Sequence, residues 1–293
     1  MLHTLVTGAT GYVGGLLVPE LLDAGHRVRA LARNPATADV DGRAELVRGD
    51  LAKDEGLDDA LAGIDVAYYL VHSMGRGNPA DFAEQDRVAA RSFGRAAARA
   101  GVARVIYLGG LEDGVDSAHL KSRHEVAQIL REHLDEVVYV RAAMVIGAGS
   151  ASFVMMSKLV ERLPVMVCPR WIDTRTQPIA VRDVTAALVA LATREEAPEE
   201  VQLGGPEVLT YREMMRRTAT LSGRRAPLMV KVPVLTPGLS SWWVVLVTPI
   251  DMGLVRPLVE GLSAEMVVTE APPPGLNDHP QAFDAAVREA LAA

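Results

Sequence analysis

The sequence predicts an α/β fold built on a doubly wound parallel sheet, followed by a small C-terminal lobe. Three observations lead to this prediction: short apolar runs alternate with longer amphipathic stretches, the runs are continuously apolar, and the rhythm changes after residue 147. Continuous apolar runs are typical of parallel strands that helices cover on both faces. The regular alternation of strand and helix favours crossovers that place helices on both sides of one sheet.

The first half of the chain supplies the strands and helices of this sheet. Each apolar run has the length of a strand and is rich in Val, Ile, Leu or Tyr. The expected strands are residues 2–7, 28–32, 44–47, 66–71, 105–108 and 137–140. The expected helices between them are residues 14–24, 56–62, 80–100 and 120–134.

The second half has a different organisation. We expect residues 1–149 to form the core of the sheet, and residues 150–293 to return strands to it and to build a small, mainly helical lobe for a substrate or partner. Helices are expected at residues 151–163, 181–192, 211–222 and 281–291, with an extended piece at 177–180. The uncharged segment 232–250 is interrupted by prolines and glycine, which favours helices of the lobe; contact with a membrane surface is the less favoured alternative.

Composition limits the classes of function. Hydrophobic residues make up 49% of the chain, charged residues 23%, and the formal net charge is -7. This balance is typical of a globular protein and argues against a nucleic-acid partner, which requires a concentrated basic surface. The single cysteine, Cys168, excludes an internal disulfide and a thiolate zinc cage, so we expect no metal site. With no signal-peptide pattern at the start, a reducing cytoplasmic location is expected.

The strongest motif reads Thr-Gly-Ala-Thr-Gly-Tyr-Val-Gly at residues 7–14, between the first strand and the first helix. Gly8 permits a tight turn, Gly11 lets the backbone approach a pyrophosphate, and Gly14 allows close packing of helix on strand. Amides at the start of the helix are then free to bind the phosphates of a dinucleotide. A glycine motif in this position predicts a Rossmann-type sheet. The expected dinucleotide-binding residues are Gly8, Thr10, Gly11, Tyr12, Val13 and Gly14. The alternative is a strand-to-helix turn without a ligand.

The end of the second strand indicates which dinucleotide the protein prefers. A site that prefers NAD usually carries an acid there, whereas this strand ends at Arg33, whose guanidinium suits the 2′-phosphate of NADP(H). Asp50 and Leu51 follow the third strand, and the Asp50 carboxylate can accept a hydrogen bond from the adenine amino group. A solvated loop arginine and a turn aspartate are the alternatives for Arg33 and Asp50.

These residues resemble the atypical and extended short-chain dehydrogenase/reductases, and more narrowly the NmrA-like NAD(P)H-binding group with the relatives of the NADPH-binding accessory subunit of complex I. The resemblance covers roughly residues 2–222. It is carried by residues 7–14, 33–35, 49–51, 69–74, 141–147, 177–184 and 204–207. It implies that Val71, His72 and Ser73 pass beside the ribose and that Met144, within residues 142–145, approaches the nicotinamide. For His72, a plain loop histidine stays open as an alternative.

The catalytic pattern departs from the one that the resemblance implies. Active members carry a tyrosine, a lysine four residues later on the helix after the fifth strand, and a serine near the end of that strand. Here the strand ends in Gly109 and Gly110, and the helix places His119 and Arg123 at the other two positions. A histidine can donate a proton near neutral pH, whereas an arginine stays charged and can only hold the ribose. His119 as an ordinary polar residue at the helix start is the alternative.

A substrate side is expected at residues 165–175, where Arg170 and Arg175 can clamp an anion and Trp171 can cover it. Surface arginines without a ligand are the alternative. Two functions stay open. The first is an NADPH-dependent reductase of a small carbonyl or quinone-like compound. The second is a non-catalytic NADP(H)-binding redox sensor or assembly protein, which would have a protein partner.

Overall fold

The computed structural model describes residues 1–71, 79–111, 118–168, 170–231 and 264–293. Its centre is a seven-stranded sheet in the order β11-β6-β5-β4-β1-β2-β3, in which every neighbouring pair is parallel. The strands are β1 (His3–Val6), β2 (Arg27–Ala32), β3 (Glu45–Arg48), β4 (Val66–Tyr69), β5 (Arg104–Gly110), β6 (Val137–Ala142) and β11 (Glu200–Leu203). The predicted doubly wound parallel sheet is therefore confirmed.

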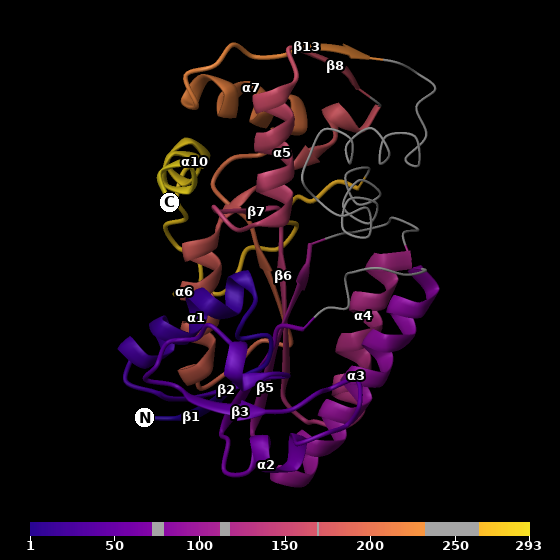
Figure 1. Ribbon diagram of the computed structural model, residues 1–293, viewed down its shortest axis with the longest axis vertical. Helices are drawn as coiled ribbons and strands as arrows, with labels where there is room; N and C mark the ends of the chain where they lie inside the picture. The colour runs from indigo at the N-terminus through magenta and orange to yellow at the C-terminus, as the bar shows by residue number, and fades with distance from the viewer. Residues whose placement is uncertain (72–78, 112–117, 169, 232–263) are drawn as a thin grey trace.

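Helices cover both faces of this sheet (Figure 1). One face carries α1 (Tyr12–Asp23) and α6 (Val181–Thr193), and the other carries α2 (Leu57–Leu61), α3 (Pro79–Ala100) and α4 (Ala118–Arg131). Successive residues of a strand point to opposite faces, so Leu5 packs with the α2, α3 and α4 side while Val6 packs with the α1 and α6 side. Both faces of β1 are thus buried, which explains its continuous apolar run.

A smaller lobe lies beyond the carboxyl ends of the strands (Figure 1). Its helices are α5 (Ala151–Arg162), α7 (Tyr211–Leu221) and α10 (Phe283–Ala292). Short strand pairs join them: β7 (Val145–Ile146) with β10 (Ile179–Ala180), β9 (Arg175–Thr176) with β12 (Leu209–Thr210), and β8 (Val165–Cys168) with β13 (Leu228–Lys231). Two 3-10 turns, η1 (Pro35–Thr37) and η2 (Arg170–Asp173), complete the described elements. The division of the chain after residue 149 stays a prediction, although β11 does return to the main sheet after it.

The lobe has its own core, rich in methionine. Its buried methionines are Met144, Met155, Met156, Met166, Met214 and Met215. The pair β8 and β13 turns Met166 and Met229 toward this core. The alternate positions Val165, Val167, Leu228 and Val230 face outward and are 44–64% exposed. An unbranched, flexible side chain fills irregular gaps, which suits a lobe built from short elements rather than one sheet.

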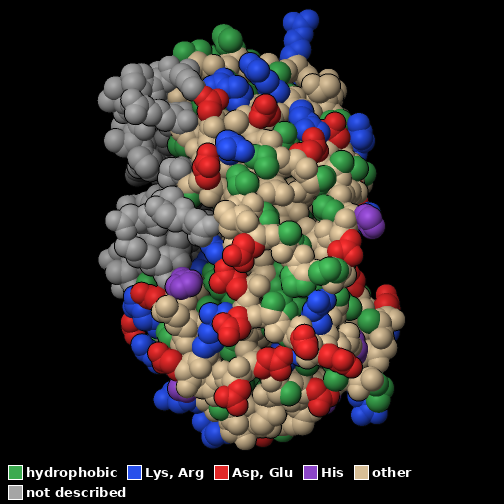
Figure 2. All heavy atoms as spheres, turned by 180° about the vertical axis from the view of Figure 1, so that it is seen from behind, with side chains coloured by type: hydrophobic (Ala, Val, Ile, Leu, Met, Phe, Trp, Pro, Cys, Tyr) green, Lys and Arg blue, Asp and Glu red, His purple; other side chains and the backbone are tan. Residues whose placement is uncertain are grey.

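The surface of the molecule mixes charges of both signs. On the face that Figure 2 shows, acidic and basic side chains are interspersed over the described residues, with scattered apolar ones between them. No helix among the described residues combines the length and apolar character that a membrane crossing requires. The apolar segment 232–250, for which lobe helices are predicted, lies outside the described residues.

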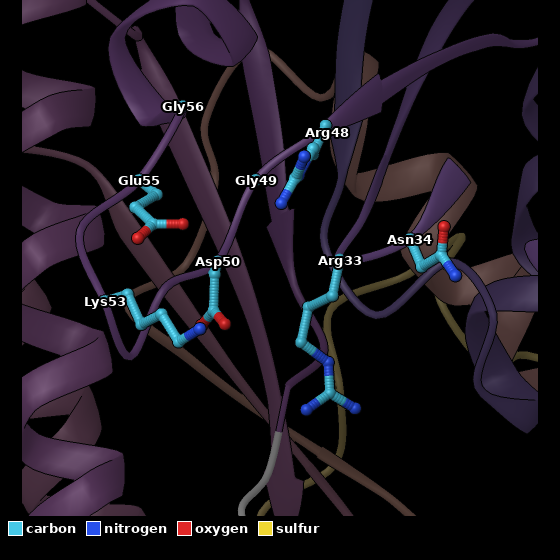
Figure 3. A pocket seen from close by; sticks show the side chains of 8 residues that line it. All are labelled: Arg33, Asn34, Arg48, Gly49, Asp50, Lys53, Glu55 and Gly56. Carbon is cyan, nitrogen blue, oxygen red and sulfur yellow. The ribbon is translucent and has the colours of Figure 1, made fainter. Parts of the chain in front are cut away.

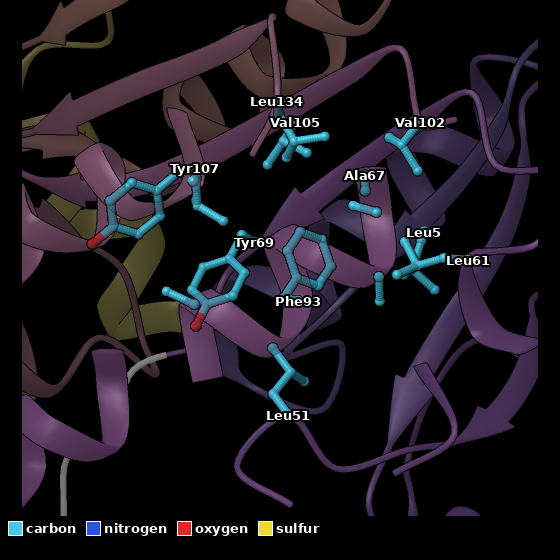
Figure 4. Close-up of a cluster of buried hydrophobic side chains, with 14 of the residues drawn as sticks. Leu5, Leu51, Leu61, Ala67, Tyr69, Phe93, Val102, Val105, Tyr107 and Leu134 are labelled. Carbon is cyan, nitrogen blue, oxygen red and sulfur yellow. The ribbon is translucent and has the colours of Figure 1, made fainter. Parts of the chain in front are cut away.

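Strand β5 is longer than predicted because its ladder with β6 continues through two glycines, up to the pair Gly110 and Ala142. Beside these strands lies an aromatic stack of Tyr69, Tyr107 and Tyr139 with Phe93, of which Figure 4 shows Tyr69, Tyr107 and Phe93. The rings of Tyr107 and Tyr139 stack at 5.0 Å between centroids, with 11° between planes, and those of Tyr69 and Tyr107 meet edge-on at 5.7 Å. A Cβ at Gly109 would lie 2.6 Å from Tyr139 Cε2 and 2.8 Å from its Oη. The ring of Tyr139 therefore occupies the space that a side chain at residue 109 would need.

Replacing Gly109 by serine is expected to destabilise the fold by about 1–3 kcal/mol, because the added side chain forces the packed ring of Tyr139 to move. In the double variant Gly109→Ser/Tyr139→Leu, the cost is expected to fall below the sum of the two single costs, since leucine leaves that space open. Urea unfolding of the two single variants and the double variant measures the change in the free energy of unfolding of each. Additive costs would show that the two positions do not compete for space.

Candidate dinucleotide-binding site

The glycine turn joins the carboxyl ends of β1 and β4. Gly8 has a φ of +67°, in the left-handed region that favours glycine, and its carbonyl oxygen accepts from the Gly11 N–H at 2.9 Å. The buried Thr7 hydroxyl donates to the Tyr68 carbonyl oxygen at 2.9 Å and accepts from the Leu70 N–H at 3.2 Å. Since β1 lies between β2 and β4, the turn stands where the strand order reverses, the usual ligand crevice of such sheets.

Close packing leaves no room for larger residues in this turn. A Cβ at Gly14 would lie 2.9 Å from Ala9 Cα and against the Gly8 carbonyl, and a Cβ at Gly8 would lie 2.9 Å from the Leu70 carbonyl oxygen. Gly11 is the N-cap of α1 and is exposed, and it offers no side chain to cap the first amides of the helix. A bare, positively polarised helix start beside a turn of glycines fits a dinucleotide pyrophosphate.

The first two residues of α1 differ in their surroundings. The side chain of Tyr12 packs onto the loop after β7: a Cβ at Gly149 would lie 2.7 Å from its Cε2. Burial raises the pKa of Tyr12, and a backbone hydrogen bond from Gly149 partly offsets this. The neighbouring Val13 is half-buried against the core between α1 and the sheet. What these residues present to the crevice is therefore backbone rather than side chain.

A pocket of about 670 Å³ lies at the ends of β2 and β3 (Figure 3). It brings together Arg33 and Asp50, the two residues that the sequence assigned to the adenosine half of a dinucleotide. The Asp50 Oδ1 accepts from the Ala52 N–H at 3.0 Å, which holds the carboxylate at the start of a tight turn. The lining is Arg33, Asn34, Arg48, Gly49, Asp50, Lys53, Glu55 and Gly56.

Other predicted cofactor residues lie away from this pocket. Leu51 is buried in the core under α2 and α3, and Val71 packs partly buried against the same core. Met144 is buried in the lobe core, and its carbonyl oxygen accepts from the Ile179 N–H at 3.0 Å. His72 and Ser73 lie outside the described residues.

The predicted catalytic pair lies at the start of α4. His119 belongs to its first turn, and its side chain lies outside the described residues. Arg123, one turn later, is half-buried, and its Nε has no hydrogen-bond partner among the described residues. Burial raises the pKa of Tyr107 well above its usual value, and the charge of Arg123 partly offsets this. The guanidinium of Arg123 therefore acts on the aromatic stack beside Gly109.

The predicted substrate residues divide between the core and the surface of the lobe. Trp171 is half-buried and meets the ring of Tyr211 edge-on, with 6.0 Å between centroids. Its Nε1 is buried and has no hydrogen-bond partner in the part of the chain that the structure describes. Arg175 is exposed on β9, and the side chain of Arg170 lies outside the described residues. The predicted anion clamp of Arg170 and Arg175 therefore stays a prediction.

Two kinds of residue escaped the sequence interpretation. Arg48 and Lys53 line the pocket, and the available signal was the position of Arg48 directly before Gly49 and Asp50 at a strand end. Gln177 ties the lobe to the main sheet. Its Nε2 donates to the Gly205 carbonyl at 2.7 Å, and its Oε1 accepts from the Val268 N–H at 3.0 Å. The side-chain amide of Gln177 thus connects its own segment to two others that are far away in the sequence.

Replacing Gly14 by alanine is expected to weaken dinucleotide binding at least about tenfold, because the new Cβ overlaps the backbone of Gly8 and Ala9 and shifts the turn. Gly15→Ala is the matched control. Its Cβ would lie 3.8 Å from the Ala9 carbonyl oxygen, so binding should be unchanged and the helix should gain up to about 1 kcal/mol. Calorimetric titration with NADPH and NADH measures both variants. Equal affinities in both would contradict the assignment of the turn.

Comparison with known proteins identifies the family. Residues 8–145 match the NAD(P)H-binding family. A relative from Streptomyces griseus subsp. griseus, (4-alkanoyl-5-oxo-2,5-dihydrofuran-3-yl)methyl phosphate reductase, is 30% identical over 227 residues, which cover 75% of this chain and 74% of that protein. Ceramide reductase from Caulobacter vibrioides is 29% identical over 263 residues, or 85% of this chain and 81% of that protein. Other relatives match over a shorter stretch, and the alignment spans only 33% and 30% of the length of two of them.

A solved structure shares the fold over nearly the whole chain. A nucleoside-diphosphate-sugar epimerase from Staphylococcus aureus superposes with a TM-score of 0.77 at 18% identity, covering 98% of this chain and 100% of that one. The family match includes the glycine turn, and the similarity to a reductase extends over 75% of the chain. The chain therefore belongs to the NAD(P)H-binding family of oxidoreductases related to the short-chain dehydrogenase/reductases.

Proposed function

We propose that the protein binds NADP(H) and reduces a small carbonyl or quinone-like compound. The observation that carries the proposal is the pocket at the end of β2, where Arg33 stands in the place that an acid takes in NAD-preferring sites. The two relatives that match over most of the chain are both named reductases, which supports the direction of the reaction.

The coenzyme preference rests on charge at the adenosine end. Arg33 is exposed toward the pocket, and no carboxylate within the described ranges lies close enough to form an ion pair with it. A guanidinium without a protein partner is available to the 2′-phosphate of NADP(H), while Asp50 faces the same pocket and suits the adenine amino group. When bound, the dinucleotide supplies the hydride that the reaction consumes.

Arg33→Ala is expected to weaken NADPH binding about tenfold or more and to leave NADH binding within about twofold, because only NADPH carries the phosphate that the guanidinium would bind. Titration of coenzyme fluorescence against the wild-type chain and the variant gives both affinities. Equal losses for the two coenzymes would mean that Arg33 supports the adenosine, not the phosphate.

For proton transfer we assign His119. It lies in the first turn of α4, which follows β5 and begins at the end of the sheet where the glycine turn lies. Its imidazole can give a proton to the carbonyl oxygen as hydride reaches the carbon. Arg123 fits a positioning role, because a guanidinium stays protonated and its charge already acts on Tyr107.

A second function, a non-catalytic NADP(H) sensor, is favoured by the surroundings of Gly109. The family's serine position is filled by the ring of Tyr139, so the usual hydroxyl beside a substrate carbonyl has no place there. A protein that keeps the coenzyme pocket and lacks this hydroxyl can report the redox state of the nicotinamide pool to a partner.

Steady-state oxidation of NADPH against a panel of aldehydes and quinones separates the two functions. For a reductase, His119→Ala is expected to lower kcat about 10²–10⁴-fold with unchanged NADPH affinity, which is the usual contribution of a general acid. His124→Ala is the control, since His124 is an exposed histidine on the same helix. Tight NADPH binding without turnover on any member of the panel would favour the sensor.

A further inference from the structure

The pocket at the ends of β2 and β3 contains two further cationic side chains besides Arg33. Arg33, Arg48 and Lys53 line it together with the carboxylates of Asp50 and Glu55. Throughout the described part of the chain, none of the three cations has a carboxylate within ion-pair distance. The lining of the pocket therefore has one positive charge in excess, and its three cations have no ion-pair partner among the described residues.

Two arginines near the pocket are bound differently. Arg29, on the same strand as Arg33, is 2.9 Å from Glu45 Oε2 and also donates to three backbone carbonyls. Arg43 forms ion pairs with Asp23 at 2.6 Å and Asp41 at 2.7 Å. Acids of the protein thus pair with Arg29 and Arg43, whereas the cations of the pocket, like Arg27 at the other end of β2, have no ion pair among the described residues.

The register of the sheet explains why Arg48 and Arg33 line the same pocket. Ala32 on β2 pairs with Arg48 on β3, and the Gly49 N–H donates to the Ala32 carbonyl at 3.1 Å. Arg33 follows Ala32 directly, so the two arginines leave adjacent strands, whose spacing is about 4.8 Å, at the same edge. Figure 3 shows the Arg48 side chain ending near Gly49, the Arg33 side chain extending away from it along the pocket, and Lys53 reaching in from the turn that follows Asp50.

The chain next to Arg48 has no side chains that obstruct this space. Gly49 and Gly56 both line the pocket. A Cβ at Gly49 would lie 2.6 Å from Leu31 Cδ1, and Gly56, with a φ of +69°, would place one against the Arg48 carbonyl. The backbone contact and positive φ restrict residue 56 to glycine, and neither glycine places a side chain between Arg48 and the pocket.

We propose that Arg48 is a second specificity-determining residue for the 2′-phosphate of NADP(H), acting with Arg33 from the neighbouring strand. This inference rests on the proposed coenzyme. A 2′-phosphate offers three acceptor oxygens and close to two negative charges, and two guanidinium groups that line one pocket match it better than one. Lys53 adds a point charge at the opposite wall.

A competing explanation is that Arg48 protects a sheet edge. β3 is the last strand of the sheet, and charged side chains on an edge strand discourage pairing with other chains. An edge-protecting arginine would not distinguish coenzymes that differ by one phosphate. Coenzyme discrimination therefore separates the two roles.

The test is a set of equilibrium titrations of the wild-type chain, Arg48→Gln and Arg27→Gln. The ligands are NADPH, NADH, 2′,5′-ADP and 5′-AMP, so that each phosphorylated probe has an unphosphorylated counterpart. Arg48→Gln is expected to weaken NADPH and 2′,5′-ADP about tenfold and to change NADH and 5′-AMP less than about twofold. Arg27→Gln, an exposed arginine without an ion pair among the described residues at the opposite end of β2, should change none of the four.

The outcomes distinguish this inference from the coenzyme proposal. Unchanged affinity for 2′,5′-ADP in Arg48→Gln, or an equal loss for all four ligands, overturns the role of Arg48. If Arg33→Ala loses NADPH while Arg48→Gln keeps it, the coenzyme proposal stands and this inference alone fails. A wild-type chain that binds NADH as tightly as NADPH overturns both. Thermal unfolding of each variant checks that a lost affinity is not a lost fold.

Discussion

The contact between Gly14 and the backbone of Gly8 and Ala9 is the constraint on which the site depends. It brings the first turn of α1 against the end of β1, at a distance that no residue with a Cβ allows. The start of the helix, with its uncapped amides, is thereby held at the point where the strand order reverses. Thr7 stabilises the same point from the other side, since its buried hydroxyl joins β1 to the end of β4. Strand order then places the residues after β2 and β3 within reach of one ligand.

The glycine turn with its neighbouring pocket and the position of the serine that the family resemblance implies lie on different strands. The glycine turn and the pocket are built at the ends of β1, β2 and β3, where the glycines and the cationic side chains lie. The expected serine belongs to β5, where the register with β6 pairs Tyr107 with Tyr139, and the ring of Tyr139 reaches over the position of Gly109. A large stacked pair there stabilises the sheet through apolar burial, and it removes the space for a small polar side chain. Residues at the end of β5 can therefore change without disturbing the glycine turn and the pocket beside it.

Local patterns predicted the sheet and most helices because their signals are local: continuous apolar runs, a glycine turn and helical periodicity. The competition between Gly109 and Tyr139 could not be predicted, because it depends on cross-strand register between residues 30 positions apart in the sequence. Arg48 was equally hidden, since a cation before a strand end fits an exposed edge as well as a ligand. Leu51 follows Asp50 directly, yet only the structure shows that its side chain turns into the core. Short pieces such as β11, with four residues, carry too little periodicity to be distinguished from loop.

The position of Tyr12 links two parts of the molecule that the sequence keeps apart. Its phenol lies on Gly147 and Gly149, in the loop that leads from β7 into the first helix of the lobe, while its backbone opens α1. A compound that bound in the lobe and shifted this loop would press on the ring of Tyr12 and, through it, on the amides at the helix start. Thermodynamic reciprocity then requires that a coenzyme seated on those amides alter the affinity for that compound by the same factor. The order in which coenzyme and compound are added would not change the final equilibrium. The measured affinity for either one would depend on how much of the other is bound.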